Sequence, residues 1–253
     1  MALLEVRGMS VSFGGLMAVS DLDLDVARGR LVGLIGPNGA GKTTFIDGLT
    51  GFVPTTGGVI FDGRTFGDLP AHRRAHLGLG RTWQSQELFD DLTIEQNLQV
   101  ASERASTTAF LLDLVRPRRP VDRTGVDFAL EVLGIGDLGS AMPNEISQGQ
   151  RVLVSVARAL AARPKLLCMD EPAAGLDTSE SHELGKRLHT IVDAGITILL
   201  VDHDMGLVLD VCEEIYVMEF GRRIAHGTPA EITNDPKVVE AYLGAKARRA
   251  QAP

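Results

Sequence analysis

One eight-residue stretch, GPNGAGKT at residues 36–43, constrains the fold of this chain more than any other feature. It follows RLVGLI, a continuous apolar run typical of a buried central strand, and it precedes residues 43–49, which can continue as a helix that Gly51 would end. The spacing G-x-x-x-x-G-K-T lets backbone N–H groups turn toward phosphate oxygens, and the N-terminus of the following helix adds its positive end. The stretch therefore predicts a phosphate-binding loop, or P-loop, between a strand and a helix.

Three side chains of this loop have distinct expected roles. Lys42 would reach the β- and γ-phosphates of a nucleotide, Thr43 would ligate Mg²⁺, and Thr44 would hold the α-phosphate. The backbone around the phosphates would come from Gly36, Pro37, Asn38, Gly39, Ala40 and Gly41. A Gly-rich structural turn is the alternative, and the position of the motif between a strand and a helix argues against it.

A second apolar strand, LLCMDE at residues 166–171, ends in two carboxylates. Asp170 is the candidate for holding Mg²⁺, and Glu171, one residue beyond it, is placed to align and deprotonate an attacking water. A strand that simply meets solvent is the alternative. Small P-loop kinases, which move phosphoryl groups between nucleotides, need no such adjacent glutamate, so the pair favours hydrolysis.

Strand and helix patterns along the chain indicate an α/β fold with an insert. Residues LLEVRGMSVSF and LDLDV show β-type alternation, and we expect an antiparallel β part at this N-terminal end. After Pro164 strand patterns alternate with helical stretches, which implies a largely parallel sheet. We expect residues 1–86 and 164–253 to form a nucleotide-binding α/β core, and residues 87–163 to form a helical subdomain.

Composition limits the classes of partner and compartment. The 253 residues are 44% hydrophobic, which is ample for a packed interior, and their formal net charge of -8 argues against nucleic acid as a partner. Cys168 and Cys212 are too few for a disulfide framework, which favours a reducing cytoplasm. The longest apolar run, ITILLV at residues 196–201, is far short of a membrane span, so we expect any membrane contact to go through a partner.

The stretch SQGQ at residues 147–150 opens a helix but carries a glycine in its first turn. Ser147 as N-cap and Gln150 three residues later form a capping box, which explains both residues without any ligand. It does not explain Gly149, which weakens the helix by about 1 kcal/mol relative to alanine. Close approach of an anion to the helix N-terminus would explain it.

With the P-loop and the two carboxylates in place, the chain resembles the ATP-binding cassette (ABC) ATPases over nearly its whole length. The remaining family motifs occur in order: the adenine-stacking aromatic (Phe13 in VSFGG), the Q-loop (Gln84 in RTWQ), the signature (Ser147 to Gln150), the D-loop (AGLD at 174–177) and the switch histidine (His203 in LLVDHD). At the signature the family pattern is L-S-G-G-Q, from which Ile146 and Gln148 depart.

This resemblance implies ATP and Mg²⁺ as cofactors. It implies that Gln84 senses Mg²⁺ and the attacking water while contacting a transmembrane partner, and that His203 contacts the γ-phosphate. It also implies that Ser147, Gly149 and Gln150 cover the γ-phosphate bound by the opposite subunit of a dimer.

Within the family, the chain is most similar to the ATP-binding subunits of branched-chain amino acid importers. DEPAAGL, VDHDMGLV and the ending GTPAEITNDPKVVEAYLG carry this resemblance. It implies a second, same or related cassette, two permease subunits, an external solute-binding protein and a place on the cytoplasmic face of the membrane. The alternatives are the ATPase of a lipid or lipopolysaccharide exporter and a non-transport ABC protein acting on DNA or ribosomes. ABC proteins of DNA repair carry long coiled coils, and those of translation carry two cassettes and a basic linker. A single acidic cassette has neither set of features.

Overall fold

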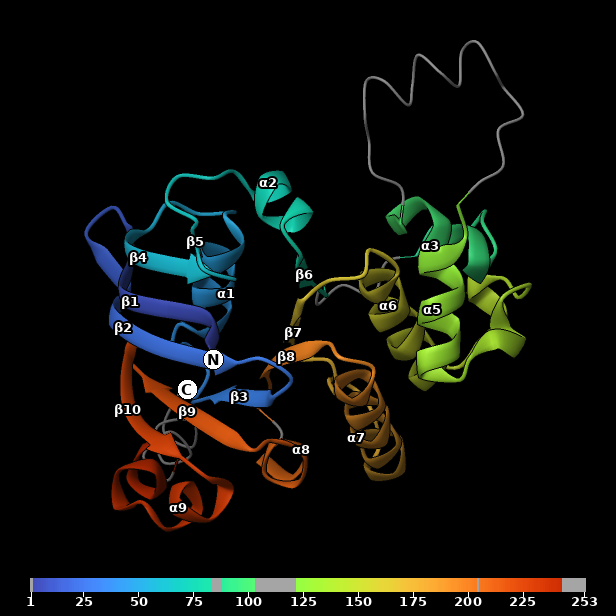
Figure 1. Ribbon diagram of the computed structural model, residues 1–253. Coiled ribbons are helices and arrows are strands. Elements are labelled where there is room, and N and C mark those ends of the chain that lie inside the picture. The colour runs from blue at the N-terminus through green and yellow to red at the C-terminus, as the bar shows by residue number, and fades with distance from the viewer. Residues whose placement is uncertain (1, 83–87, 103–121, 204, 243–253) are drawn as a thin grey trace. The chain divides into compact units, whose positions relative to one another are not determined.

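The computed structural model describes residues 2–82, 88–102, 122–203 and 205–242. The chain divides into two compact units (Figure 1). One unit combines Met1–Gln84 with Lys165–Pro253, and the other consists of Ser85–Pro164.

The first unit begins with an antiparallel sheet whose strand order is β2-β1-β4-β5. Its strands are β1 (Ala2–Phe13), β2 (Leu16–Ala27), β4 (Thr56–Phe61) and β5 (Arg64–Thr65). Along β1 and β2 buried residues such as Val6 and Leu24 alternate with exposed ones, because one face of the sheet covers the core. This sheet is the antiparallel β part that the sequence predicts.

The second sheet of this unit has six strands in the order β10-β9-β3-β8-β7-β6. They are β3 (Leu31–Ile35), β6 (Leu79–Arg81), β7 (Leu166–Asp170), β8 (Thr197–Val201), β9 (Glu214–Glu219) and β10 (Arg222–Gly227). All neighbours are parallel except β9 and β10, which form an antiparallel hairpin. The expected largely parallel sheet is therefore confirmed. Every residue of β3, β7 and β8 is buried, which explains their continuous apolar sequences.

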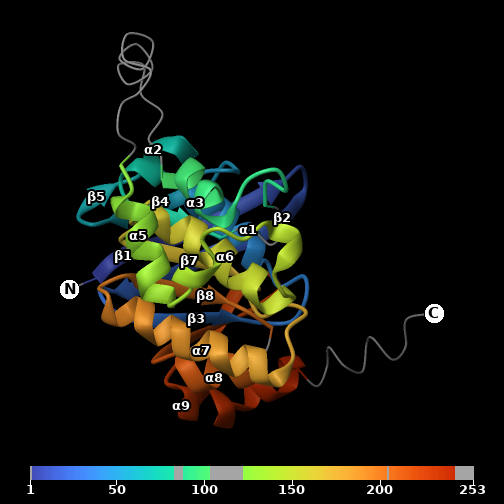
Figure 2. The same ribbon diagram turned by 90° about the vertical axis from the view of Figure 1, so that its right-hand side faces the viewer.

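Helices cover both faces of the six-stranded sheet. Helix α1 (Lys42–Thr50) contacts β1, β2 and β7 and so lies between the two sheets, while α7 (Thr178–Asp193) and α8 (Met205–Val211) pack on the opposite face against β3 and β8 (Figures 1 and 2). The unit also contains α2 (Ala71–His76), α9 (Pro229–Asn234) and a helical stretch at residues 236–242. The hydrophobic core of the unit surrounds α1, with Phe45, Ile46 and Leu49 fully buried.

The second unit is helical. It contains α3 (Ile94–Ser102), α5 (Thr124–Leu133), two short 3₁₀ turns (Gly136–Leu138 and Pro143–Glu145) and α6 (Gln148–Ala161), with α3 and α5 both packed on α6. Helix α6 begins with the predicted capping box, in which Gln150 N donates to Ser147 Oγ at 3.2 Å and Ser147 N donates to Gln150 Oε1 at 2.8 Å. In the part of the chain that the structure describes, no helix has the length and apolar character needed to cross a membrane.

Candidate nucleotide-binding site

The P-loop joins the buried strand β3 to helix α1, as the sequence predicts. Two of its glycines, Gly36 and Gly41, are required by close backbone contacts. A Cβ atom on Gly36 would lie 2.1 Å from the carbonyl oxygen of Met218, and one on Gly41 would lie 2.4 Å from that of Ala18. Gly41 also has a φ of 99° as the N-cap of α1, a conformation that glycine adopts readily. The loop therefore packs tightly between β2 and β9, and this packing fixes the direction of α1.

Lys42 lies in the first turn of α1 with its ammonium group folded back over the loop. Its Nζ atom donates to the carbonyl oxygens of Gly36 at 2.8 Å and Pro37 at 3.2 Å, and the residue is only 5% exposed. Burial lowers the pKa of Lys42, while nearby carboxylates, of which Glu171 contributes most, act in the opposite direction. The positive charge is thus held at the centre of the loop, where phosphate oxygens are expected.

Thr43 and Asp170 bring together oxygens of the kind that Mg²⁺ prefers. Thr43 Oγ1 lies 3.4 Å from Asp170 Oδ1, although β8 separates the strands β3 and β7 that lead to these residues. Among the described residues, no group of three or more His, Cys, Asp and Glu side chains is arranged to hold a metal ion. One hydroxyl and one carboxylate nevertheless fit Mg²⁺, because this ion commonly takes few protein ligands and completes its shell with water and substrate phosphates.

Arg81, whose side chain is 9% exposed, is a neighbour of this pair that the sequence analysis does not identify. Its guanidinium lies 3.5 Å from Asp170 Oδ2 and 2.5 Å from Asp47 Oδ1, so it links the end of β7 to α1. Burial raises the pKa of Asp170, and the positive charge of Arg81 opposes that effect. Arg81 stands at the end of β6, far from both partners in sequence, and no local pattern marks it.

The ends of β7 and β8 place further polar side chains at the same edge of the sheet. Glu171 has a φ of 50°, and its backbone N–H donates to the carbonyl oxygen of Val201 at 2.7 Å. His203 Nδ1 lies 3.6 Å from Glu171 Oε2 and 3.5 Å from Asp202 Oδ1. Asp202 is fully buried and accepts a hydrogen bond from Ala173 N at 3.2 Å. Glu171 and His203, which the sequence selects from separate motifs, are therefore neighbours.

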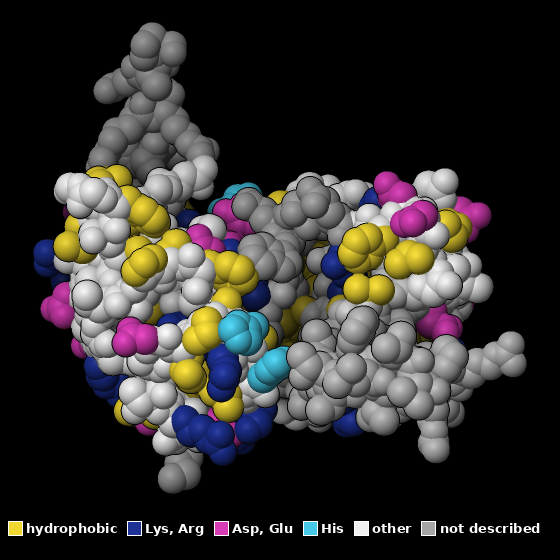
Figure 3. Space-filling view, turned by 90° about the horizontal axis from the view of Figure 1, so that it is seen from above, with side chains coloured by type: hydrophobic (Ala, Val, Ile, Leu, Met, Phe, Trp, Pro, Cys, Tyr) yellow, Lys and Arg dark blue, Asp and Glu magenta, His cyan; other side chains and the backbone are white. Residues whose placement is uncertain are grey.

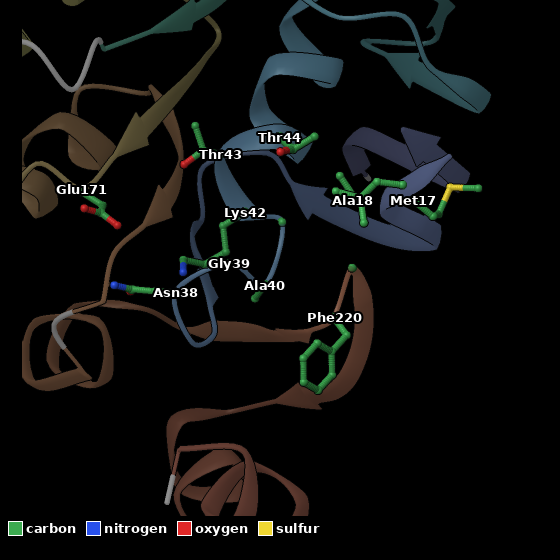
Figure 4. Close-up of a pocket in the computed structure, with 13 residues that line it drawn as sticks. Met17, Ala18, Asn38, Gly39, Ala40, Lys42, Thr43, Thr44, Glu171 and Phe220 are labelled. Carbon is green, nitrogen blue, oxygen red and sulfur yellow. The ribbon is translucent and has the colours of Figure 1, made fainter. Parts of the chain in front are cut away.

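A pocket of about 470 Å³ lies over the P-loop (Figure 4). Its polar part comprises the loop backbone from Asn38 onward, Lys42, Thr43, Thr44 and Glu171. Its remaining wall comes from the start of β2 and from the turn between β9 and β10, through Leu16, Met17, Ala18, Phe220 and Gly221. The pocket thus offers a phosphate-binding region and an apolar region side by side.

Two predicted site elements are not among the residues that line this pocket. Phe13, at the end of β1, is 51% exposed and is not among the residues that line the pocket. Ser147, Gly149 and Gln150 belong to the helical unit, where Ser147 is exposed and bonded within the capping box. Gln84 lies outside the described residues.

Comparison with known proteins agrees with this geometry. The family model described as ABC transporter matches residues 19–174, which is more than half of the chain. The chain belongs to the ABC transporter family. It is a cassette of the ATP-hydrolysing class, and a second model, described as branched-chain amino acid ATP-binding cassette transporter, matches its residues 222–248.

Individual relatives cover almost the whole cassette. It is 39% identical over 249 residues to the high-affinity branched-chain amino acid transport ATP-binding protein BraF of Pseudomonas aeruginosa, covering 96% of this chain and 98% of BraF. It is 36% identical over 245 residues to the lipopolysaccharide export system ATP-binding protein LptB of Escherichia coli K12, with the same shares covered. The crystal structure of the ADP conformation of MJ1267, an ATP-binding cassette of an ABC transporter, superposes with a TM-score of 0.83 at 30% identity, covering 96% of this chain and 99% of MJ1267.

Proposed function

We propose that this cassette binds ATP with Mg²⁺, hydrolyses it, and thereby drives the uptake of branched-chain amino acids or a similar small polar solute through permease subunits. The observation that carries the catalytic part is the meeting of Lys42 and Glu171 in one pocket over the P-loop. The similarity to BraF and the match of residues 222–248 to the branched-chain amino acid model support the solute class.

The described residues suggest a division of labour in hydrolysis. The loop N–H groups and Lys42 bind the phosphates, and Thr43 and Asp170 would hold Mg²⁺, which when bound neutralises charge that develops on the transferred phosphoryl group. Glu171 accepts the proton of the attacking water. His203, 3.6 Å from Glu171, contacts the γ-phosphate from the end of β8.

The remaining predicted residues extend the proposal to other parts of the assembly. Phe13 would stack on adenine, Gln84 would contact both Mg²⁺ and a permease subunit, and the signature residues would act on the nucleotide of a second cassette. The two cassettes would be attached to the cytoplasmic face of the membrane through the permeases, which receive the solute from a solute-binding protein. In this proposal the helical unit is the subdomain that carries the signature.

The exporter alternative has support from the 36% identity to LptB. The formal net charge of -8 argues against a nucleic-acid partner. On the face seen from above in Figure 3, acidic as well as basic side chains are interspersed with hydrophobic ones. Such a mixture is not the single-signed surface that a phosphate backbone selects.

Transport assays on the whole complex would test the proposed function. The cassette is purified together with its permease subunits and reconstituted in vesicles with their solute-binding protein. We expect ATP-dependent accumulation of leucine or isoleucine, and loss of that accumulation in a matched complex carrying Glu171→Gln. ATP-dependent extraction of lipopolysaccharide without amino acid uptake would instead establish the exporter alternative.

Dimers that carry two substitutions, either divided between the subunits or placed in one subunit, would test the role of the signature. If Ser147 acts across the dimer, Lys42→Ala in one subunit and Ser147→Arg in the other damage the same nucleotide site and leave one site whole. Both changes in a single subunit then damage both sites. Nucleotide occlusion counted per dimer distinguishes these cases, and full occlusion of one site only when both changes share a subunit would contradict action in trans.

A further inference from the structure

The turn between β9 and β10 carries an aromatic residue where turn geometry does not favour one. Only Phe220 and Gly221 connect the paired residues Glu219 and Arg222, and their φ angles are 47° and 77°. Positive φ at both central positions is the pattern of a type I′ hairpin, which prefers Asn, Asp or Gly at the first position. A bulky residue with positive φ is uncommon and strained, so the turn itself gives no reason for a phenylalanine.

A second hairpin of the same protein shows the preferred alternative. Asp62 and Gly63 connect the paired residues Phe61 and Arg64 with φ angles of 50° and 73°. This turn has nearly the same backbone as that at Phe220, and it uses the Asp-Gly pair that such turns favour. The comparison isolates the identity of Phe220 as the feature that needs an explanation.

Packing in the core does not supply that explanation. Phe220 is 67% exposed, more than Phe13 at 51%, yet it is one of the residues that line the pocket over the P-loop. Figure 4 shows Glu171 at one end of this pocket and Phe220 and Met17 at the other, with the P-loop residues between them. The ring therefore borders the apolar part of the pocket, away from the carboxylate.

The position of this turn is fixed relative to the P-loop. Gly221 N donates to the carbonyl oxygen of Ala40 at 2.9 Å, and Ser20 N donates to that of Gly221 at 2.8 Å. A Cβ atom on Gly221 would lie 2.6 Å from the carbonyl oxygen of Ala18, so the turn packs directly on β2. Because one backbone hydrogen bond joins the turn to the loop, Phe220 keeps its place beside a nucleotide whose phosphates the loop binds.

We propose that Phe220 is a nucleotide-binding residue that contacts the base of the bound nucleotide, with the apolar wall of Leu16, Met17 and Ala18 beside it. The inference rests on the proposed nucleotide binding and adds to it a base contact from the β9–β10 turn, separate from that assigned to Phe13. The phosphates need the charge and N–H groups of the P-loop, whereas the flat face of a base gains most from an aromatic side chain. The two ends of the pocket meet these two needs.

The substitution Phe220→Asn tests this inference, because base contact and turn stability make opposite predictions for it. Asparagine suits the turn, so the melting temperature should stay at or above that of the parent protein. Loss of the ring should weaken ADP binding by about tenfold, the size expected for removal of one base–aromatic contact. Binding of inorganic tripolyphosphate, which has no base, should stay within about twofold of the parent value.

Two further variants complete the test, with calorimetric titration of ADP and tripolyphosphate as the readout. Phe220→Tyr keeps the ring and should bind ADP with parent affinity. Phe89→Asn removes another exposed phenylalanine, at 46%, from the helical unit and should leave ADP binding unchanged.

The results that would contradict this inference differ from those that would contradict the proposed function. Parent-like ADP affinity in Phe220→Asn, or an equal loss for ADP and tripolyphosphate, would overturn the inference and leave the proposed function standing. Failure of the parent protein to bind ADP would overturn the proposed function and this inference with it.

Discussion

Arg74 on α2 offers a demanding test of how the P-loop helix is held in place. The side chain is 5% exposed, and its nitrogens donate to the carbonyl oxygens of Gly48 at 2.9 Å, Leu49 at 2.7 Å, Gly67 at 3.0 Å and Leu69 at 2.7 Å. Two of these carbonyls belong to the last turn of α1, where helix carbonyls have no partner within the helix. The cation also lies at the negative end of the helix dipole.

The substitution Arg74→Met keeps an unbranched apolar stem and removes every donor. Each buried carbonyl left without a partner costs about 1–3 kcal/mol. Burial lowers the pKa of Arg74, which shows that keeping its charge away from water is itself unfavourable, and loss of that charge offsets part of the sum. Gly48 O still accepts a hydrogen bond from Gly51 N, and the exposed Gly67 can bind water instead. The cost therefore falls mainly on the carbonyls of Leu49 and Leu69, and we expect a net loss of about 2 kcal/mol in the free energy of unfolding.

Urea denaturation measures this loss directly as a lower midpoint at an unchanged slope. Hydrogen exchange in α1 adds a local readout, because the amides of this helix should lose protection first. Arg73→Met alters the exposed neighbouring arginine and should change stability by no more than about 0.5 kcal/mol. Equal midpoints for Arg74→Met and Arg73→Met would refute the reasoning that buried carbonyls of α1 depend on Arg74.

Three further predictions concern Asn97, Arg81 and the two cysteines. Asn97 is fully buried and bonded to backbone groups of residues 89, 92 and 93, so Asn97→Leu should destabilise the helical unit by about 2–3 kcal/mol. Hydrogen exchange in α3 would detect this loss, and unchanged protection would contradict the prediction. Arg81→Met leaves two carboxylates without their shared cation and should cost about 3 kcal/mol, and a parent-like denaturation midpoint would disprove it. Burial raises the pKa of Cys168 to about 12 and also raises the pKa of Cys212, so both thiols stay protonated at pH 8. A thiol reagent should therefore react with neither cysteine until urea unfolds the chain. Rapid reaction of the folded protein would contradict this prediction.

The sequence suffices to predict the parts of the fold and site that local patterns determine. The run RLVGLI becomes the fully buried strand β3. Glycine spacing marks the loop before α1 because Gly36 and Gly41 meet backbone contacts that exclude a side chain, and Gly39 has a positive φ. The capping box of Ser147 and Gln150 is likewise a local signal and is confirmed. The α/β architecture follows from the alternation of such elements.

Contacts between distant segments lie beyond such patterns. Arg81 contacts Asp47 and Asp170, which are 34 and 89 residues away in the sequence. The local sequence LGLGR at residues 77–81 does not predict either partner. HRRAH contains two adjacent arginines, and only the packed structure shows that Arg74 is the buried one. Phe220 has an ordinary sequence setting, and its importance appears only once the turn is seen beside the P-loop. The role of Phe13 in adenine stacking stays a prediction.

The most direct test of the central claim, ATP hydrolysis with Glu171 as the base, is single-turnover cleavage of bound ATP by the purified cassette and its Glu171→Gln variant. Glutamine keeps the size and hydrogen-bonding capacity of the side chain beside His203 but cannot take a proton from water. ATP binding should therefore stay within about twofold of the parent value, while the rate of cleavage falls by about 10² or more. Glu240→Gln, at an exposed glutamate of the C-terminal helical stretch, should cleave ATP at the parent rate. Parent-like cleavage by Glu171→Gln would contradict the assignment of the base.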